Sequence, residues 1–491
     1  SRRNAAIAMP GADFVFSSHT FRAPYWRRRL YTTQGHVSRN VPILFYRRTN
    51  HLAGHTERIG VQPHNAHSSL TSATAPDTTA ISRRSGVNEA WRWAVRLWLG
   101  VELLFAGWCA WVSSVYPKWN DEAAVSVWPG SAPLGAWLER VLLLPLLRYD
   151  VLWYAGIAQY GYGHRAGDTA FHPLFPALMG VLGRVFGGSY GAYLLAGWIV
   201  AQVCTVVMLA LFYQLVALDY ERDTAQRATL YLLISPLGFA FLIPYTEPLL
   251  LMCIVGALLA ARQGRWALAG LAGAGAALTK QPGVVVLLPL MWEWWAWRKR
   301  QKIGGQSGAP QGWQTLIRPL AGIALTPLGL LAWLVYRATL GDVALTWNNP
   351  ASIVDALLVT PTYKDVWGET FSWPWVNFGY ALEQLQTRPY FYLIINTFLM
   401  LIMLVLAVFA VLRMRGSYVI YTVVLVLMNL SIVYPLWPYM GIIRRFTIIF
   451  PLFIGLALWG RSRLLHALIV ICSSLLWVLI GSMYVRNAFV P

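Results

Sequence analysis

The sequence is short of charge, and above all of acidic charge. Only 12% of its 491 residues are charged, and 39 Lys and Arg outnumber 20 Asp and Glu. Ordinary soluble domains have about 25% charged residues, so this composition argues against a water-soluble fold. The formal net charge of +19 would otherwise suggest nucleic acid as a partner. Here the basic residues lie in an N-terminal tail and in short loops between apolar runs, which is typical of membrane topology.

Cysteine is also scarce, and its placement excludes a disulfide framework or a zinc site. No CxxC pair is present, and every cysteine lies inside an apolar run. We interpret them as buried thiols. The four are Cys109, Cys204, Cys253 and Cys472.

Apolar and aromatic residues are abundant instead. They make up 57% of the chain, with 25 Trp and 24 Tyr. Runs of roughly 20 apolar residues recur from about Trp91 onward, long enough to cross a hydrocarbon layer about 30 Å thick. Backbone groups left unpaired in lipid are costly, so we expect these runs to be helices. We predict an all-α polytopic membrane protein with about 11 spans: 92–115, 189–217, 226–243, 246–262, 265–279, 283–297, 316–339, 390–412, 417–436, 445–460 and 464–485.

The first 88 residues differ from the rest. They are rich in Arg, Ser, Thr and His, and they include a low-complexity stretch from Ser68 to Ser82. This composition predicts a disordered basic tail. Its Arg-rich, acid-poor character fits a transit peptide and a cytoplasmic tail equally. Residues 89–491 are predicted to form the membrane domain.

Basic loops orient the membrane domain, because cytoplasmic loops carry the excess of Lys and Arg. With the N-terminus inside, the basic loops at 219–227, 262–265, 298–302, 413–415 and 461–463 all fall on the cytoplasmic side. This holds only if the short apolar segment 171–186, interrupted by Pro173 and Pro176, does not span. We therefore predict a re-entrant or interfacial helix there. The polar segments 116–170 and 341–389 then lie on the external face.

One stretch, 148–162, carries the clearest chemical signal. Read as a helix, it places Asp150 on one face with Trp153, Tyr154 and Ile157. We predict an amphipathic helix in the interface with a carboxylate at its start. Asp150 is the candidate general base. The structural alternative is a helix N-cap, where Asp is favoured.

Three blocks of the sequence resemble the PIG-V-like mannosyltransferases, the family that includes the enzyme adding the second mannose to glycosylphosphatidylinositol. The resemblance covers roughly residues 90–485 and weakens after Arg300; it does not cover the N-terminal tail. It implies the GT-C fold, with external juxtamembrane helices, and transfer of a sugar, typically mannose, from a polyprenyl-phosphate donor on the non-cytoplasmic face. The matching blocks are Tyr149-Asp150, Trp153-Tyr154, Ile157-Ala158 and Gly161-Tyr162; Phe171-His172-Pro173-Leu174-Phe175-Pro176; and Ser235-Pro236 with Tyr245-Thr246-Glu247.

Further candidate residues lie at the external ends of the predicted spans. Glu247 opens one span, where a carboxylate is costly without a partner or a task; we interpret it as a second catalytic residue, against a helix-start carboxylate favoured by the macrodipole. Lys280 follows a helix with small residues at 269, 273 and 277, a spacing that favours close helix packing. Family members commonly have Arg near this place, so Lys keeps the charge and loses the bidentate fork. Arg444 and Arg445 break the positive-inside trend.

These three basic residues are interpreted as ligands of the donor phosphate. The remaining predicted substrate-binding residues are Tyr149, Trp153, Tyr154 and His172. No metal site is predicted, because the acidic residues of the external loops lack metal-site spacing. A divalent cation shared with Asp150 stays open. The loop residues concerned are Asp168, Asp342, Asp365 and Glu369.

The sequence therefore predicts an integral membrane hexosyltransferase that acts on a lipid or glycan acceptor, with membrane lipid and no nucleic acid as partners. The membrane would be the plasma membrane in a prokaryote and the endoplasmic reticulum in a eukaryote. A multi-span transporter or flippase is the alternative. That class predicts internal repeats and charges near the bilayer midplane, whereas the sequence has no clear repeat and its charges gather at one face.

The topology is testable with single cysteines at positions 150 and 298 in a background that lacks the four native cysteines. We expect position 150 to react with a membrane-impermeant maleimide from outside, and position 298 only after permeabilisation. Labelling of both from the same side would mean that segment 171–186 spans.

Overall fold

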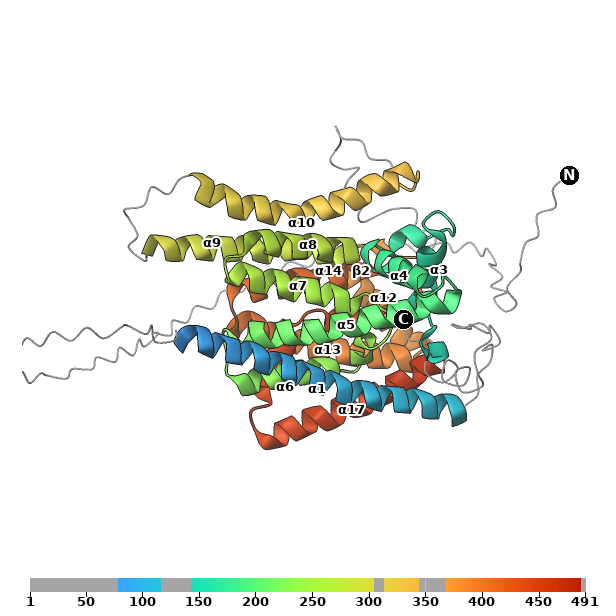
Figure 1. Ribbon diagram of the computed structural model, residues 1–491. Helices are drawn as coiled ribbons and strands as arrows, with labels where there is room; N and C mark the ends of the chain where they lie inside the picture. The colour runs from blue at the N-terminus through green and yellow to red at the C-terminus, as the bar shows by residue number, and fades with distance from the viewer. Residues whose placement is uncertain (1–77, 116–142, 304–312, 344–348, 350–367, 487–491) are drawn as a thin grey trace, which may run out of the picture. The chain divides into compact units, whose positions relative to one another are not determined.

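The computed structural model describes residues 78–115, 143–303, 313–343, 349 and 368–486. This part of the chain is a bundle of helices packed side by side (Figure 1), so the all-α prediction is confirmed there. The long helices are α1 (Thr78–Val115), α5 (Tyr190–Ala217), α7 (Glu247–Arg262), α8 (Trp266–Thr279), α9 (Leu287–Ile303), α10 (Trp313–Thr339), α12 (Pro374–Thr387), α13 (Phe391–Arg413), α14 (Gly416–Ser431) and α17 (Arg463–Val485). The shorter helices are η2 (Leu144–Leu146), α3 (Asp150–Tyr160), η3 (Asp168–Ala170), α4 (Leu174–Val185), α6 (Arg222–Leu233), η4 (Gly238–Phe241), η5 (Gln281–Val286), α15 (Ile442–Thr447) and α16 (Pro451–Trp459).

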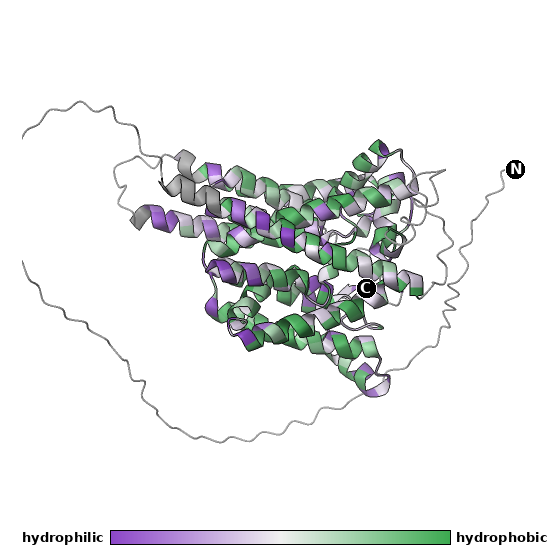
Figure 2. Ribbon diagram, turned by 60° about the horizontal axis from the view of Figure 1, so that its bottom comes forward, coloured by the Kyte–Doolittle hydropathy of each residue, from purple (hydrophilic) through white to green (hydrophobic). Residues whose placement is uncertain are grey.

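Five helices in the described residues are long and apolar enough to cross a membrane, by length and composition. They indicate a membrane protein, and hydrophobic residues cover most of the helix lengths (Figure 2). The total of about 11 spans stays a prediction. The five are Gly86–Val115 within α1, α5, Ile317–Thr339 within α10, α13 and α17.

Prolines interrupt two of the predicted spans. The run 226–243 is helical only to Leu233, and Ser235-Pro236 then leads into η4. The run 445–460 is divided between α15 and α16, the second of which begins at Pro451. Proline lacks the N–H that a helix interior needs and disfavours helical geometry in the residue before it. These segments are therefore pairs of short helical pieces.

The predicted run 417–436 also changes conformation before its end. Helix α14 stops at Ser431, and Ile432–Val433 forms strand β2, which pairs antiparallel with β1 (Thr370–Phe371). The register joins Thr370 to Val433 and Phe371 to Ile432. This is the only sheet in the part of the chain that the structure describes. The pairing ties a segment before α12 to the end of α14.

The structure bears on the predicted disordered tail only at its end, and it describes the segment 171–186 in full. Residues 1–77 and Asp365 lie outside the described residues, but α1 begins at Thr78, inside the segment predicted to be disordered. Helix α4 has 12 residues, which is about 18 Å at 1.5 Å per residue and shorter than a hydrocarbon layer of about 30 Å. Its length agrees with a segment that does not span.

The prediction that the helix at 150–160 is amphipathic is wrong, while its placement in the membrane interface stays a prediction. Helix α3 buries Val151, Tyr154 and Ala155 in the bundle, and its most exposed side chains, Leu152 and Tyr160, are also largely apolar. It packs against α4 and α5. The helix therefore has apolar residues on all sides instead of one apolar and one polar face.

Helices α8 and α10 approach each other unusually closely, as the small-residue spacing predicted. A Cβ added at Gly270 would overlap the backbone of Gly322, and one added at Gly273 would overlap Thr326. A Cβ at Gly329 would lie 2.8 Å from the Ala274 carbonyl oxygen. Helices in lipid associate through such close packing, because the hydrophobic effect supplies little force between them. The contact positions the end of α8, and with it Lys280.

Gly273→Leu should destabilise the protein by about 1–3 kcal/mol or more, the usual cost of overpacking. Ala267→Leu is the matched control, since Ala267 is exposed on the same helix. Thermal unfolding in detergent should show a clear drop for the first variant and little change for the second. Equal melting temperatures would contradict the packing argument.

Candidate active site

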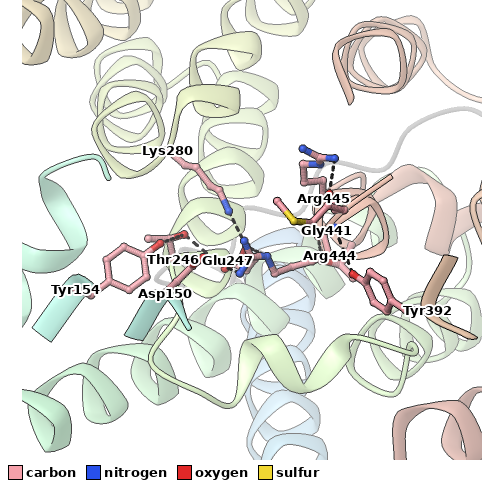
Figure 3. Close-up of polar contacts among 11 residues, drawn as sticks. Asp150, Tyr154, Thr246, Glu247, Lys280, Tyr392, Gly441, Arg444 and Arg445 are labelled. Carbon is pink, nitrogen blue, oxygen red and sulfur yellow. Dashed lines mark hydrogen bonds and ion pairs between the residues drawn. The ribbon is translucent and has the colours of Figure 1, made fainter. Parts of the chain in front are cut away.

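Four charged side chains from four separate segments meet in one cluster (Figure 3). Asp150 opens α3, and Glu247 opens α7 just before a proline, which is well suited to the first turn of a helix. Lys280 stands between α8 and η5, where Gln281-Pro282 ends the α-helix. Arg444 lies in α15. Asp150, Glu247 and Lys280 are thus each placed at the end of a helix, and Arg444 lies within a helix of six residues.

The four form a continuous ion-pair network. The Arg444 guanidinium donates from Nη1 to Asp150 Oδ2 at 2.7 Å, and its Nε lies 3.5 Å from Glu247 Oε1. Lys280 Nζ donates to the same Glu247 oxygen at 2.8 Å. Arg444 thus bridges two carboxylates, and Glu247 lies between two cations.

Burial is uneven across this network. Glu247 is 2% exposed, whereas Arg444, Asp150 and Lys280 are 15%, 20% and 25% exposed. Two carboxylates and two cations also balance one another, which limits the cost of holding charges away from water. The side chains of Asp150, Lys280 and Arg444 are therefore partly accessible to a ligand. Glu247 is buried and pairs with the two cations.

Neutral hydroxyls complete the cluster. The hydroxyls of Tyr154 and Thr246 are 3.3 Å apart, and Thr246 donates to Glu247 Oε2 at 3.5 Å. Burial raises the pKa of Tyr154 well above its usual value, and the nearby Asp150 and Glu247 carboxylates raise it further. Tyr154 is therefore a neutral hydrogen-bonding group at physiological pH. It connects α3 to the first turn of α7.

The backbone immediately before Asp150 is strained. Tyr149 has φ 50° and ψ −118°, a combination that residues with a side chain rarely adopt. The ring of Tyr149 packs 5.7 Å from that of Tyr484. Strain of this kind often accompanies functional sites and must be stabilised by surrounding contacts. It turns the chain so that Asp150 faces Arg444.

The carboxylate of Asp150 does not act as an N-cap. Tyr149 occupies the cap position of α3, no side chain caps this end, and Asp150 is the first helical residue. Its side chain bonds Arg444 instead. A purely structural role for Asp150 would therefore be limited to placing a negative charge at the start of a helix, where the helix dipole favours it.

Arg445 does not join Arg444 in the ion-pair network, and its predicted role in binding the donor stays a prediction. In Figure 3 Arg445 points away from Glu247, and its Nη2 donates to the Met440 carbonyl oxygen at 2.8 Å. Its guanidinium lies 5.6 Å from the ring of Tyr434, whose hydroxyl donates to Glu369. Adjacent residues of a helix point about 100° apart, so the side chains of Arg444 and Arg445 leave α15 in different directions.

The other predicted binding residues lie beside the network. His172 is buried, donates from Nδ1 to the Ala277 carbonyl oxygen at 2.7 Å and has its pKa lowered to about 4 by burial. It is therefore neutral at physiological pH and links α4 to α8. The Trp153 ring stacks on Phe171 at 5.5 Å, with the Arg165 guanidinium 3.9 Å from its centre.

Sequence reasoning missed two features of this part of the fold. The ring of Tyr245 lies 4.9 Å from the Arg444 guanidinium, a cation–π contact that its place in the third sequence block did not reveal. A second charged network lies at the other end of α7, where Arg262 binds Asp219 through two bonds of 2.8 Å. Nearby, Arg415 binds Glu293 at 2.6 and 2.7 Å. The sequence signal that could have revealed this second network was Glu293, an acidic residue inside the predicted span 283–297.

An apolar groove shares two helices with the charged network. It has a volume of about 480 Å³ and runs between α3, α4, α8 and α10. Ile157 lines it on α3, the helix that Asp150 opens, and Leu278 lines it on α8, which ends just before Lys280. Pro176 and Trp333 form further parts of its wall. The charged residues themselves do not line the groove, but α3 and α8 connect the two features.

Comparison with protein-family models, curated proteins and solved structures finds no match. The fold and the site by themselves define a class: an α-helical protein with apolar helices suited to a membrane and a charged cluster beside an apolar groove. Among the described residues, no group of three or more His, Cys, Asp or Glu side chains could hold a metal ion.

Lys280→Met should destabilise the protein by about 1–3 kcal/mol, because the buried Glu247 carboxylate loses its closest cation. Adding Glu247→Gln should restore part of that loss, with a coupling of at least about 0.5 kcal/mol in a double-mutant cycle. Thermal unfolding in detergent measures both.

Arg222→Met is the control for this cycle. Its pair with Glu89 also has a 2.8 Å separation but is 65% and 32% exposed, and such pairs contribute about 1 kcal/mol or less. Strictly additive effects at Lys280 and Glu247 would show that their contact contributes nothing.

Proposed function

We propose that this protein is a membrane glycosyltransferase, an inverting mannosyltransferase that moves a sugar from a polyprenyl-phosphate donor to a lipid or glycan acceptor on the non-cytoplasmic face. The observation that supports it most is the cluster of Asp150, Arg444, Lys280 and Glu247 beside an apolar groove. A lipid phosphate needs cations for its head and an apolar surface for its chain.

The chemistry of transfer assigns a role to each group. Asp150 takes the proton of the acceptor hydroxyl as its oxygen bonds to the anomeric carbon of the sugar. The bond between that carbon and the phosphate oxygen breaks, and the polyprenyl phosphate leaves with one more negative charge. Arg444 and Lys280 stabilise this charge as it develops. Glu247 positions both cations.

The apolar groove fits the isoprenoid chain of such a donor. Its wall includes residues of α3, which Asp150 opens, and Leu278 of α8, which ends just before Lys280. We expect an isoprenoid chain in the groove to direct its phosphate end toward Lys280. Apolar pockets with a few convergent polar groups are typical of ligand sites. The groove supports a lipid-linked substrate over a soluble sugar nucleotide.

The contacts among the three sequence blocks also support the proposal. Tyr154 of the first block packs its ring on Phe171 and Phe175 of the second, at 5.1 and 5.2 Å, and its hydroxyl meets Thr246 of the third. Segments that are far apart in the sequence and resemble one enzyme family are thus in direct contact. A shared site is the simplest reason for such a set of blocks.

A transporter or flippase remains the second candidate, and one residue favours it. Glu102 lies within the first candidate span, is 8% exposed and accepts a hydrogen bond from Trp198 Nε1 at 3.3 Å. Carboxyl groups inside a membrane often serve ion or proton pathways. Glu102 belongs to α1 and contacts Trp198 of α5, and neither the groove nor the charged network includes it.

Asp150→Asn should reduce sugar transfer by about 10²- to 10⁴-fold, the usual loss on removing a general base. Transfer is measured with purified protein, radiolabelled polyprenyl-phosphate mannose and a panel of lipid and glycan acceptors. Glu102→Gln is the matched control and should keep most of the activity, since it also replaces a carboxyl by an amide in the bundle.

Each result separates the two candidates. Near-normal transfer by a folded Asp150→Asn protein would rule out the base assignment. Absence of transfer by the unaltered protein with every donor and acceptor would reject the transferase. Flux across proteoliposomes that depends on Glu102 would then favour the transporter.

A further inference from the structure

Arg444 has two possible anionic partners in the substrate-free protein, and it uses both. Its closest contact is the 2.7 Å bond to Asp150, the carboxylate assigned as the base, and it is also 3.5 Å from Glu247. The Arg444 guanidinium thus occupies the Oδ2 atom of Asp150 in this state, through a charge-assisted hydrogen bond. The base is therefore masked by its ion-pair partner.

We propose that the Arg444–Asp150 ion pair is a lock that the donor phosphate opens, so that donor binds before acceptor. The inference rests on the proposed function and adds an order of binding to it. The donor phosphate competes with Asp150 for the guanidinium of Arg444. Asp150 becomes available as a base only after the phosphate has taken its place.

The charge balance of the cluster selects Asp150 as the group that is released. Two carboxylates and two cations are neutral together, and a phosphodiester adds one negative charge, so one anion must give up its cation. Glu247 is 2% exposed and has Lys280 at 2.8 Å. Asp150 is 20% exposed, and the ion pair with Arg444 is its only one among the described residues. Releasing the more exposed carboxylate costs less desolvation energy.

The transfer step then closes the cycle with atoms and charges balanced. Before transfer, the phosphodiester and Asp150 each have one negative charge. The acceptor proton moves to Asp150, the acceptor oxygen bonds to the sugar, and the polyprenyl phosphate leaves with two negative charges. Arg444 is attracted more strongly to this product than to the donor. Loss of the product and of the proton from Asp150 restores the lock.

The lock makes an unusual prediction about the base. Asp150→Asn removes the competitor for Arg444, so it should tighten the binding of polyprenyl phosphate while it removes catalysis. We expect the dissociation constant to fall roughly 5- to 50-fold, within the range expected when a charge-assisted hydrogen bond no longer has to be exchanged. Undecaprenyl phosphate is the probe, and binding to the full chain in detergent is measured by intrinsic tryptophan fluorescence.

Glu369→Gln is the control for a general loss of negative charge. Glu369 also lies near α15, but it accepts its bond from Tyr434, beside Arg445, and does not contact Arg444. The dissociation constant of this variant should stay within about twofold of that of the unaltered protein, because Glu369 does not compete for Arg444 and its charge is paired with the Tyr434 hydroxyl. Asp150→Ala should behave like Asp150→Asn and replaces it if the amide impairs folding, which size-exclusion chromatography and thermal unfolding report.

The outcomes distinguish the lock from the proposed function. Tighter binding by the Asp150 variants alone supports the lock. Unchanged or weaker binding by folded Asp150 variants, with normal binding by the unaltered protein, overturns the lock and leaves the transferase standing. Equal tightening by Glu369→Gln also overturns it, because general electrostatics would then be the cause. Absence of binding by the unaltered protein overturns both.

Discussion

Glu247 begins a helix that the bundle surrounds on nearly every side, and its carboxylate is almost completely removed from water. An unpaired charge in that place would cost several kcal/mol, so the fold has to place cations beside it. Lys280, at the end of α8, and Arg444, in α15, are these cations. The geometry of the whole site follows from this requirement, because Arg444 in turn holds Asp150.

The same helix is held at both ends by ion pairs. At its start Glu247 binds Lys280, and at its end Arg262 binds Asp219 through two hydrogen bonds. The close packing of α8 on α10 fixes the position of Lys280 from a second side. Charged networks at the two ends of a buried helix and small-residue contacts between its neighbours hold the charged side chains in place. In the proposed reaction, charge placed in advance in this way would stabilise the negative charge that develops on the phosphate.

Much of the site could be predicted from local sequence, because its members stand where a rule is broken. Asp150 and Glu247 are rare acids that precede apolar runs, Lys280 follows a small-residue run, and Arg444 is a cation on the side predicted to be external, where cations are rare. Local rules failed where tertiary contacts decided the outcome. The spacing around Asp150 suggested an amphipathic helix, yet α3 buries residues against α4 and α5 and exposes apolar side chains. Arg445 had the same sequence signal as Arg444 but points elsewhere.

The sequence by itself indicated that lipid surrounds much of the chain and that the fold is α-helical. Low charge and recurrent apolar runs are local properties, and unpaired backbone groups in lipid leave the helix as the simplest solution. Only the tertiary structure decided which charges meet. Asp150, Glu247, Lys280 and Arg444 come from four separate segments, and their distances depend on how prolines interrupt helices and how glycines let helices approach. Ion pairing falls off over a few ångströms, so no one-dimensional pattern contains it.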